Sequence, residues 1–140
     1  IELEDIKSIV QGSKRIDIFA LLDFIWNCQL DKSLKGLHLL FERGTVSQEG
    51  DSVSDSTAIG LQFLRLFHYR LKQMWKISVS KDFGNVPEFA KRKLSEQAKN
   101  FPAERLKKMW ELLLQTEFNI KTSKTSPALA IEMLIVSILR

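Results

Sequence analysis

A helical repeat of apolar residues runs through almost all of this 140-residue chain and constrains its fold more than any other feature. Apolar side chains return every three or four positions, the spacing that keeps them on one face of an α-helix. The longest stripe comprises Ile59, Phe63, Leu66, Phe67, Leu71 and Met74. The alternation that marks a half-buried strand is nearly absent. The sequence therefore predicts an all-α fold, a compact bundle of six or seven helices with no sheet.

Capping residues and helix breakers predict where the helices begin and end. A short amphipathic piece from Leu3 ends at Gly12, and a mostly buried helix covers about residues 16–28. The next helix is capped by Asp31 and ends at Gly44. The stretch "GTVSQEGDSVSDS" has no apolar period and is expected to be one long loop. The remaining helices are expected from Ser54 or Asp55 to about Trp75, after Pro87, after Pro102, and from Pro127 with Ser126 as its cap.

Two of these helices carry specific expectations about burial. The helix after Pro87 is expected to turn Phe89, Ala90, Leu94 and Ala98 inward. The helix after Pro102 is expected to bury a stripe of Leu106, Met109, Trp110, Leu113 and Leu114. Both expectations follow from the helical spacing of these residues.

Composition limits the class of protein. The chain is 44% hydrophobic and 27% charged, as in ordinary globular proteins, and no window reaches eighteen uncharged apolar residues, so no membrane span is predicted. The N-terminus "IELEDIKSIV" is acidic and does not resemble a secretory signal, and the missing initiator Met suggests a piece of a longer chain. Cys28 is the only cysteine, so no internal disulfide is expected and a reducing compartment is indicated.

The net charge of +4 is unevenly distributed. Residues 1–61 carry 6 Lys/Arg against 10 Asp/Glu, whereas residues 62–124 carry 14 against 6. A basic half could face an acidic partner or nucleic acid. The same cations recur at helical spacing opposite an apolar stripe, as on any solvated helix face. A free-standing basic helical domain that binds nucleic acid directly therefore stays open as an alternative function.

No catalytic, cofactor-binding or metal-binding constellation can be read from the sequence. Neither G-x-x-x-x-G-K-[ST] nor G-x-G-x-x-G occurs, so no phosphate-binding loop is encoded. His38 and His68 are thirty residues apart and lack paired Cys or His, the pattern of a zinc site. We predict that this segment is not an enzyme and has no ATPase, nuclease or polymerase activity of its own.

Glu132 raises a question, because it lies inside the otherwise apolar run from Pro127 to Leu139. A buried carboxylate needs a partner. Glu117 follows Leu113 on the stripe of the preceding helix, and Lys121 lies four residues beyond it in the favourable order. The short turn "TSKTS" should fold the last helix back antiparallel. We therefore predict a structural polar knot of Glu117, Lys121 and Glu132, with a catalytic carboxylate dyad as the rival interpretation.

Several segments, in this order and spacing, resemble the C-terminal part of the delta subunit of the bacterial DNA polymerase III clamp loader. They are "IELEDIKSIV", "IFALLDFIW", "DKSLKGLHLLFERG", "IGLQFLRLFHYRLKQMW", "VPEFAKRKLSEQAKNF", "LKKMWELLLQTEFNIKTS" and "ALAIEMLIVSIL". The positions Glu117, Ile120, Lys121, Thr122 and Glu132 match the family. Ser123 stands where the family often has Gly, and the loop "TVSQEGDSVSDS" is longer than usual.

The resemblance implies a helical collar domain that joins like modules of the gamma/tau and delta-prime types in a ring of five subunits. Residues 1–12 would be the tail of a preceding lid-like domain, and residues 13–140 the collar, or oligomerisation, domain. The family's sliding-clamp contact is made by an N-terminal domain absent from this sequence, and DNA is bound by the complex. The implied role is that of a non-catalytic subunit of a DNA-directed DNA polymerase holoenzyme, in the bacterial cytoplasm and without a cofactor.

A collar must also offer apolar surface to neighbouring subunits. The long helix that carries Trp75 and the final helix are the predicted interface helices. Trp75, Met133 and Val136 are the candidate interface residues. If Glu132 and Lys121 are not partners, we expect Glu132 to face water in this chain and to meet its partner only in the assembled ring.

Overall fold

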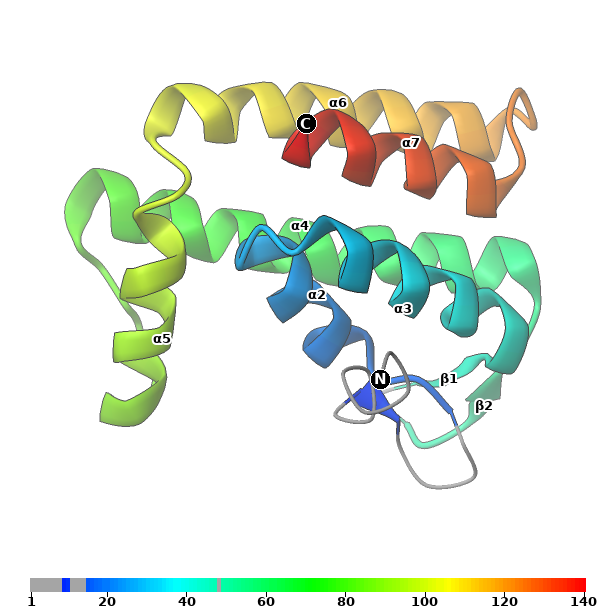
Figure 1. The fold of residues 1–140 in the computed structure, drawn as a ribbon, viewed down its shortest axis with the longest axis horizontal. Helices are drawn as coiled ribbons and strands as arrows, with labels where there is room; N and C mark the ends of the chain where they lie inside the picture. The colour runs from blue at the N-terminus through cyan, green and yellow to red at the C-terminus, as the bar shows by residue number, and fades with distance from the viewer. Residues whose placement is uncertain (1–8, 11–14, 48) are drawn as a thin grey trace.

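The 25-residue helix α4 (Ser56–Ser80) is the longest element, and the rest of the fold packs around it. The computed structural model describes residues 9–10, 15–47 and 49–140 (Figure 1). Before α4 come α2 (Ile18–Trp26), α3 (Leu30–Arg43), β1 (Thr45–Val46) and β2 (Ser52–Val53). After it come α5 (Glu88–Ala98), α6 (Ala103–Lys121) and α7 (Pro127–Leu139). Six α-helices in the described residues confirm the predicted all-α bundle.

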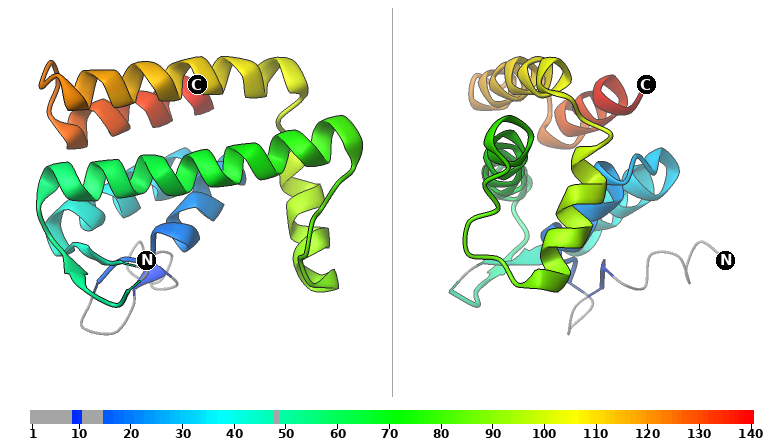
Figure 2. Two further views of the ribbon diagram at one scale, coloured as in Figure 1. Left: turned by 180° about the vertical axis from the view of Figure 1, so that it is seen from behind. Right: turned by 90° about the vertical axis from the view of Figure 1, so that its left-hand side faces the viewer.

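The helices form a bundle with one projecting arm. α6 runs alongside α4, α7 folds back against α6, and α3 packs on α7 (Figure 1). α2 packs on α3 and α4, while α5 stands away from the bundle at one end of α4. The end-on view in Figure 2 places α4 and α6 on one side of the bundle and α3 and α7 on the other. The bundle therefore has two distinct flanks.

Two predicted helix starts are confirmed by their caps. The Asp55 carboxylate accepts a hydrogen bond from the Ala58 backbone N–H at 3.0 Å. Ser126 accepts one from the Leu129 N–H at 3.4 Å, and Pro127 occupies the first turn of α7. Each cap satisfies an N–H that has no partner within the helix. The predicted cap at Asp31 is wrong, because α3 starts at Leu30 with Gln29 as its N-cap and Asp31 lies in its first turn.

Two other expectations about chain course need correction. The segment after Gly44 contains an antiparallel pairing of β1 with β2, so the prediction of no sheet is wrong for these four residues. They pair because Ser47 N–H donates to the Asp51 carbonyl and closes a turn between them. α4 also continues five residues beyond Trp75, because Ile77 is buried, and ends at Ser80; its C-cap Lys81 has the left-handed conformation (φ 57°).

The core is built on aromatic contacts and aliphatic stripes. Trp26 packs edge-on to Phe101 at 4.7 Å and stacks with Phe67 at 5.8 Å. Ile9 is fully buried in the same cluster, whereas the rest of the short piece from residue 3 to 12, apart from Val10, lies outside the described residues. Gly36 packs so closely that an added Cβ would lie 2.6 Å from Leu21 Cδ1.

Two side chains expected in the core are exposed. Phe89 is 80% exposed, because α5 buries only Leu94 and Gln97 and its first turn points away from the bundle. Leu114 is 59% exposed, because the buried stripe of α6 runs through Leu113 and leaves Leu114 on the flank. In the described part of the chain, no helix combines the length and apolarity needed to cross a membrane.

Candidate functional site

Two members of the predicted polar knot meet, and the third does not. Lys121 Nζ lies 2.7 Å from Glu117 Oε2, and these side chains are 58% and 39% exposed. Glu132 is exposed on α7 and, among the described residues, makes no hydrogen bond or ion pair. Its expected burial is wrong, because the core face of α7 carries Ile131, Leu134 and Ile135 and turns Glu132 outward. The structure does not join Glu132 to the Glu117–Lys121 pair.

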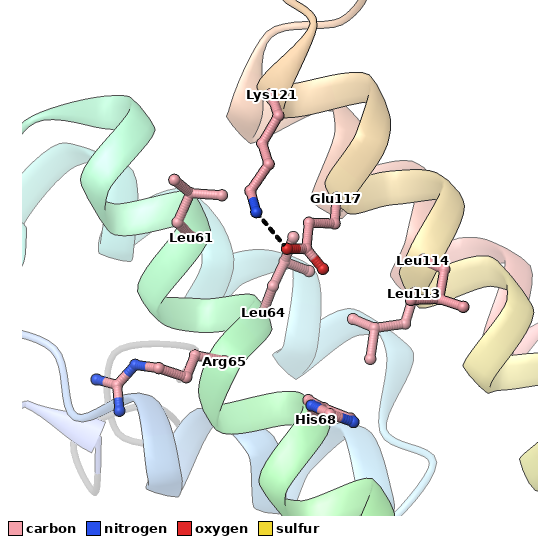
Figure 3. A pocket seen from close by; sticks show the side chains of 8 residues that line it. All are labelled: Leu61, Leu64, Arg65, His68, Leu113, Leu114, Glu117 and Lys121. Atoms are coloured by element: carbon pink, nitrogen blue, oxygen red, sulfur yellow. Dashed lines mark ion pairs between the residues drawn. The ribbon is translucent and has the colours of Figure 1, made fainter.

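The Glu117–Lys121 pair lies at one end of a groove between α4 and α6, which we call the α4–α6 groove (Figure 3). The groove measures about 310 Å³. It is lined by Leu61, Leu64, Arg65, His68, Leu113, Leu114, Glu117 and Lys121. Leu61 and Leu114 supply its more exposed apolar surface, whereas Leu64 and Leu113 are buried. Lys121 reaches toward Glu117, and the Arg65 side chain points away from α6 (Figure 3).

The two histidines lie on different helices in separate surroundings. His68 packs edge-on against Trp110 with ring centroids 5.2 Å apart, beside the α4–α6 groove. His38 Nε2 lies 3.8 Å from Glu42 on the exposed face of α3. No cluster of three potential metal ligands occurs within residues 9–10, 15–47 and 49–140.

A second apolar surface lies on the outer face of α7. Leu129 and Met133 are 49% and 57% exposed, and Val136 is half-buried. Together with Glu132 they follow i, i+3, i+4 and i+7 spacing, so they share one face of the helix. We call these four residues the α7 ridge. The candidate interface residues Met133 and Val136 therefore lie on one exposed apolar face.

The third candidate interface residue has a different environment. Trp75 is half-buried and packs against the hydrophobic core from α4. It lies seven residues beyond His68, on the side of α4 that faces α6. Trp75 therefore contributes more to the core than Met133, whose side chain is mostly in solvent.

The sequence reasoning missed a polar cluster that joins three helices. Asp23 Oδ1 of α2 accepts hydrogen bonds from Arg70 Nη1 at 3.0 Å and from Gln97 Nε2 at 3.1 Å. Lys93 Nζ of α5 lies 3.1 Å from Asp23 Oδ2, and Arg70 also donates to Gln97 Oε1 at 3.3 Å. This Asp23 cluster ties α5 to α2 and α4. It was recognisable as a carboxylate inside the apolar run "IFALLDFIW".

The environment of Asp23 acts on its pKa in two directions. Burial raises the pKa of the Asp23 carboxyl. Hydrogen bonds from Gln97, Arg70 and Lys93, with the charge of Arg70, outweigh burial and bring the pKa below its ordinary value of 3.8. Because Arg70 is buried, the ionised carboxylate neutralises a cation that water cannot reach well. The cluster is therefore structural, and it orients α5.

Comparisons with known proteins place this chain in a family. The family model described as "DNA polymerase III delta subunit, C-terminal domain" matches residues 61–138, from the second turn of α4 to the last turn of α7. No curated protein and no solved structure matches the chain. The matched range includes both the α4–α6 groove and the α7 ridge. Since the match covers more than half of the sequence, the chain belongs to the family formed by the C-terminal domains of DNA polymerase III delta subunits.

Proposed function

We propose that this chain is the assembly module, or collar, of a clamp-loader delta subunit. It holds the subunit in the ring that loads the sliding clamp onto primed DNA during replication. The observation that carries the proposal is the family match over residues 61–138. On this proposal the neighbours in the ring are subunits of the gamma/tau and delta-prime types, in the bacterial cytoplasm, and DNA is bound by the assembled complex.

The α7 ridge supports an assembly role. Two of its four residues are large apolar side chains that are about half exposed, on a helix that is apolar on nearly all sides. Contiguous exposed apolar surface of this kind is typical of protein interaction sites. The division into a tail at residues 1–12 and a collar at residues 13–140 belongs to the same proposal. In this proposal the module has no catalytic role, and the catalytic activity of the holoenzyme belongs to other chains.

Co-elution in gel filtration tests the proposal. The purified chain is mixed with purified loader subunits, and the double variant Leu129→Asp/Met133→Asp is run beside it. We expect the wild-type chain to enter a complex and the variant to be lost from it, because two carboxylates would be buried in an apolar contact. Asp31→Lys, which reverses the charge of an exposed residue on α3, is the control. Failure of the wild-type chain to join any complex would refute the assembly role.

One observation favours direct nucleic-acid binding as a second candidate. Arg65, Lys72 and Lys76 are exposed along α4 beside Tyr69, which is 61% exposed. A cationic stripe with an exposed aromatic ring is suited to single-stranded nucleic acid. Such binding should weaken steeply with salt, whereas an apolar collar contact should not. Fluorescence anisotropy with a labelled oligonucleotide over a salt series separates the two functions.

A further inference from the structure

The assembly role proposed above assigns no contact to the α4–α6 groove. We propose that it docks a helix of the neighbouring module in the ring, and that this helix presents apolar side chains flanking a carboxylate. The inference rests on the proposed function, since it requires a ring of like modules. It goes beyond that function by giving the groove an occupant of defined chemistry.

The apolar surface of the groove is exposed mainly at Leu114. Leu64 and Leu113 are buried between the helices, Leu61 is half-buried, and Leu114, 59% exposed, stands on the α6 side (Figure 3). An aliphatic side chain entering the groove would bury itself and Leu114 together. The groove is open along the bundle flank, so it suits side chains that project from a helix lying across α4 and α6.

The charges around the groove are mainly positive. Lys121 is already paired with Glu117 at 2.7 Å, so this pair is close to neutral. Arg65 is exposed and has no acidic partner among the described residues. An Arg guanidinium can hold a carboxylate through two parallel hydrogen bonds. Arg65, at the α4 edge of the groove, therefore favours an Asp or Glu on the part of the occupant that lies over α4.

The α7 ridge displays the matching surface on the same chain. Leu129, Met133 and Val136 form an apolar row, and Glu132 beside them is an exposed carboxylate without an ion pair in the described structure. The groove is lined by residues of α4 and α6, whereas the ridge is formed by exposed residues of α7. Figure 2 shows α4 and α6 on one side of the bundle and α3 and α7 on the other. Modules that associate head to tail around a ring need two different, complementary surfaces. The occupant is therefore the ridge-like helix of the neighbouring module.

Photo-crosslinking in the assembled complex tests the identity of the occupant. Leu114 is replaced by p-benzoylphenylalanine, and Lys72, exposed on α4 outside the groove, is replaced likewise as the control. We expect the probe at position 114 to crosslink to a helix of one purified loader subunit that has i, i+4, i+7 apolar spacing and an adjacent Asp or Glu. Equal crosslinking from position 72, or a crosslinked segment without a carboxylate, would overturn the proposal.

A charge reversal tests the role of Arg65. Arg65→Glu should raise the dissociation constant for the partner subunits by roughly 10-fold or more, and the effect should shrink at high salt. Lys107→Glu, exposed on α6 outside the groove, is a charge reversal of the same kind and should alter the constant by less than about 3-fold. Equal effects of the two variants would contradict the proposal.

The outcomes separate this inference from the proposed function. If the wild-type chain binds the loader subunits and Arg65→Glu binds equally well, only the docking site is refuted. If the wild-type chain binds none of them, the assembly role is refuted as well. If Arg65→Glu abolishes binding of a single-stranded oligonucleotide and leaves subunit binding intact, Arg65 serves nucleic-acid binding and the proposed occupant is wrong.

Discussion

Removing the Asp23 carboxylate should destabilise the domain more than any exposed charge change. Asp23→Ala leaves the Arg70 guanidinium, 8% exposed, with only the 3.3 Å hydrogen bond to Gln97 Oε1 in the described cluster. Removing one partner of a buried ion pair lowers the free energy of unfolding by about 3–5 kcal/mol. Asp23 itself is 25% exposed, so water can partly replace it and we expect about 3 kcal/mol. Asp23→Asn keeps one oxygen acceptor and should cost about 1–2 kcal/mol.

Urea denaturation at neutral pH measures these differences in the free energy of unfolding. Asp31→Ala, an exposed carboxylate in the first turn of α3, is the control and should change stability by less than about 0.5 kcal/mol. The double variant Asp23→Leu/Arg70→Met removes both charges and should recover part of the loss. Strictly additive effects of Asp23→Leu and Arg70→Met made singly, or a cost below about 1 kcal/mol for Asp23→Ala, would show that Asp23 and Arg70 are not energetically coupled.

The pH dependence of stability gives an independent check on Asp23. Its folded-state pKa is lowered, so its contribution is fully present above the unfolded value near 3.8. The contribution is lost as the pH falls from there through the folded pKa. The stability difference between wild type and Asp23→Asn should therefore narrow below about pH 4. A difference that stays constant through this range would contradict the assignment.

Other substitutions test the surface and the packing. Glu132→Gln should change the isolated chain's unfolding free energy by less than about 0.5 kcal/mol, because Glu132 is exposed; a loss above about 2 kcal/mol in thermal denaturation would mean that it is buried after all. Lys121→Met should cost less than about 1 kcal/mol, because its pair with Glu117 is exposed; a larger loss in the same assay would restore the predicted knot. Gly36→Ala should cost about 1–3 kcal/mol by urea titration, since its Cβ would press on buried Leu21; unchanged stability would show that Leu21 can move aside.

Local signals were sufficient for most of the fold. Caps at Asp55 and Ser126 and the proline at Pro127 depend on groups a few residues apart, so the sequence shows both partners. The short β1–β2 pairing was missed because it depends on a turn closed by backbone groups. Such turns have only a weak sequence signal.

The candidate site was harder to predict, because similar patterns had opposite outcomes. Asp23 and Glu132 are each the single acidic residue of an apolar helix. Asp23 pairs with Arg70, which lies 47 residues further along the chain, whereas Glu132 is exposed on the outer face of α7. Helical periodicity cannot separate these cases when a helix is apolar on nearly all sides. The apolar outer face of α7 then resembles a buried face in the sequence, and only packing reveals the exposed Met133.

Sedimentation velocity of the chain mixed with purified gamma/tau-type and delta-prime-type subunits, without DNA, tests the assembly role most directly. We expect a faster-sedimenting complex that persists at high salt, because the α7 ridge offers apolar contact. The Leu129→Asp/Met133→Asp variant should sediment as the free chain. A wild-type chain that stays free beside these subunits, and sediments faster only with DNA at low salt, would contradict the assembly role.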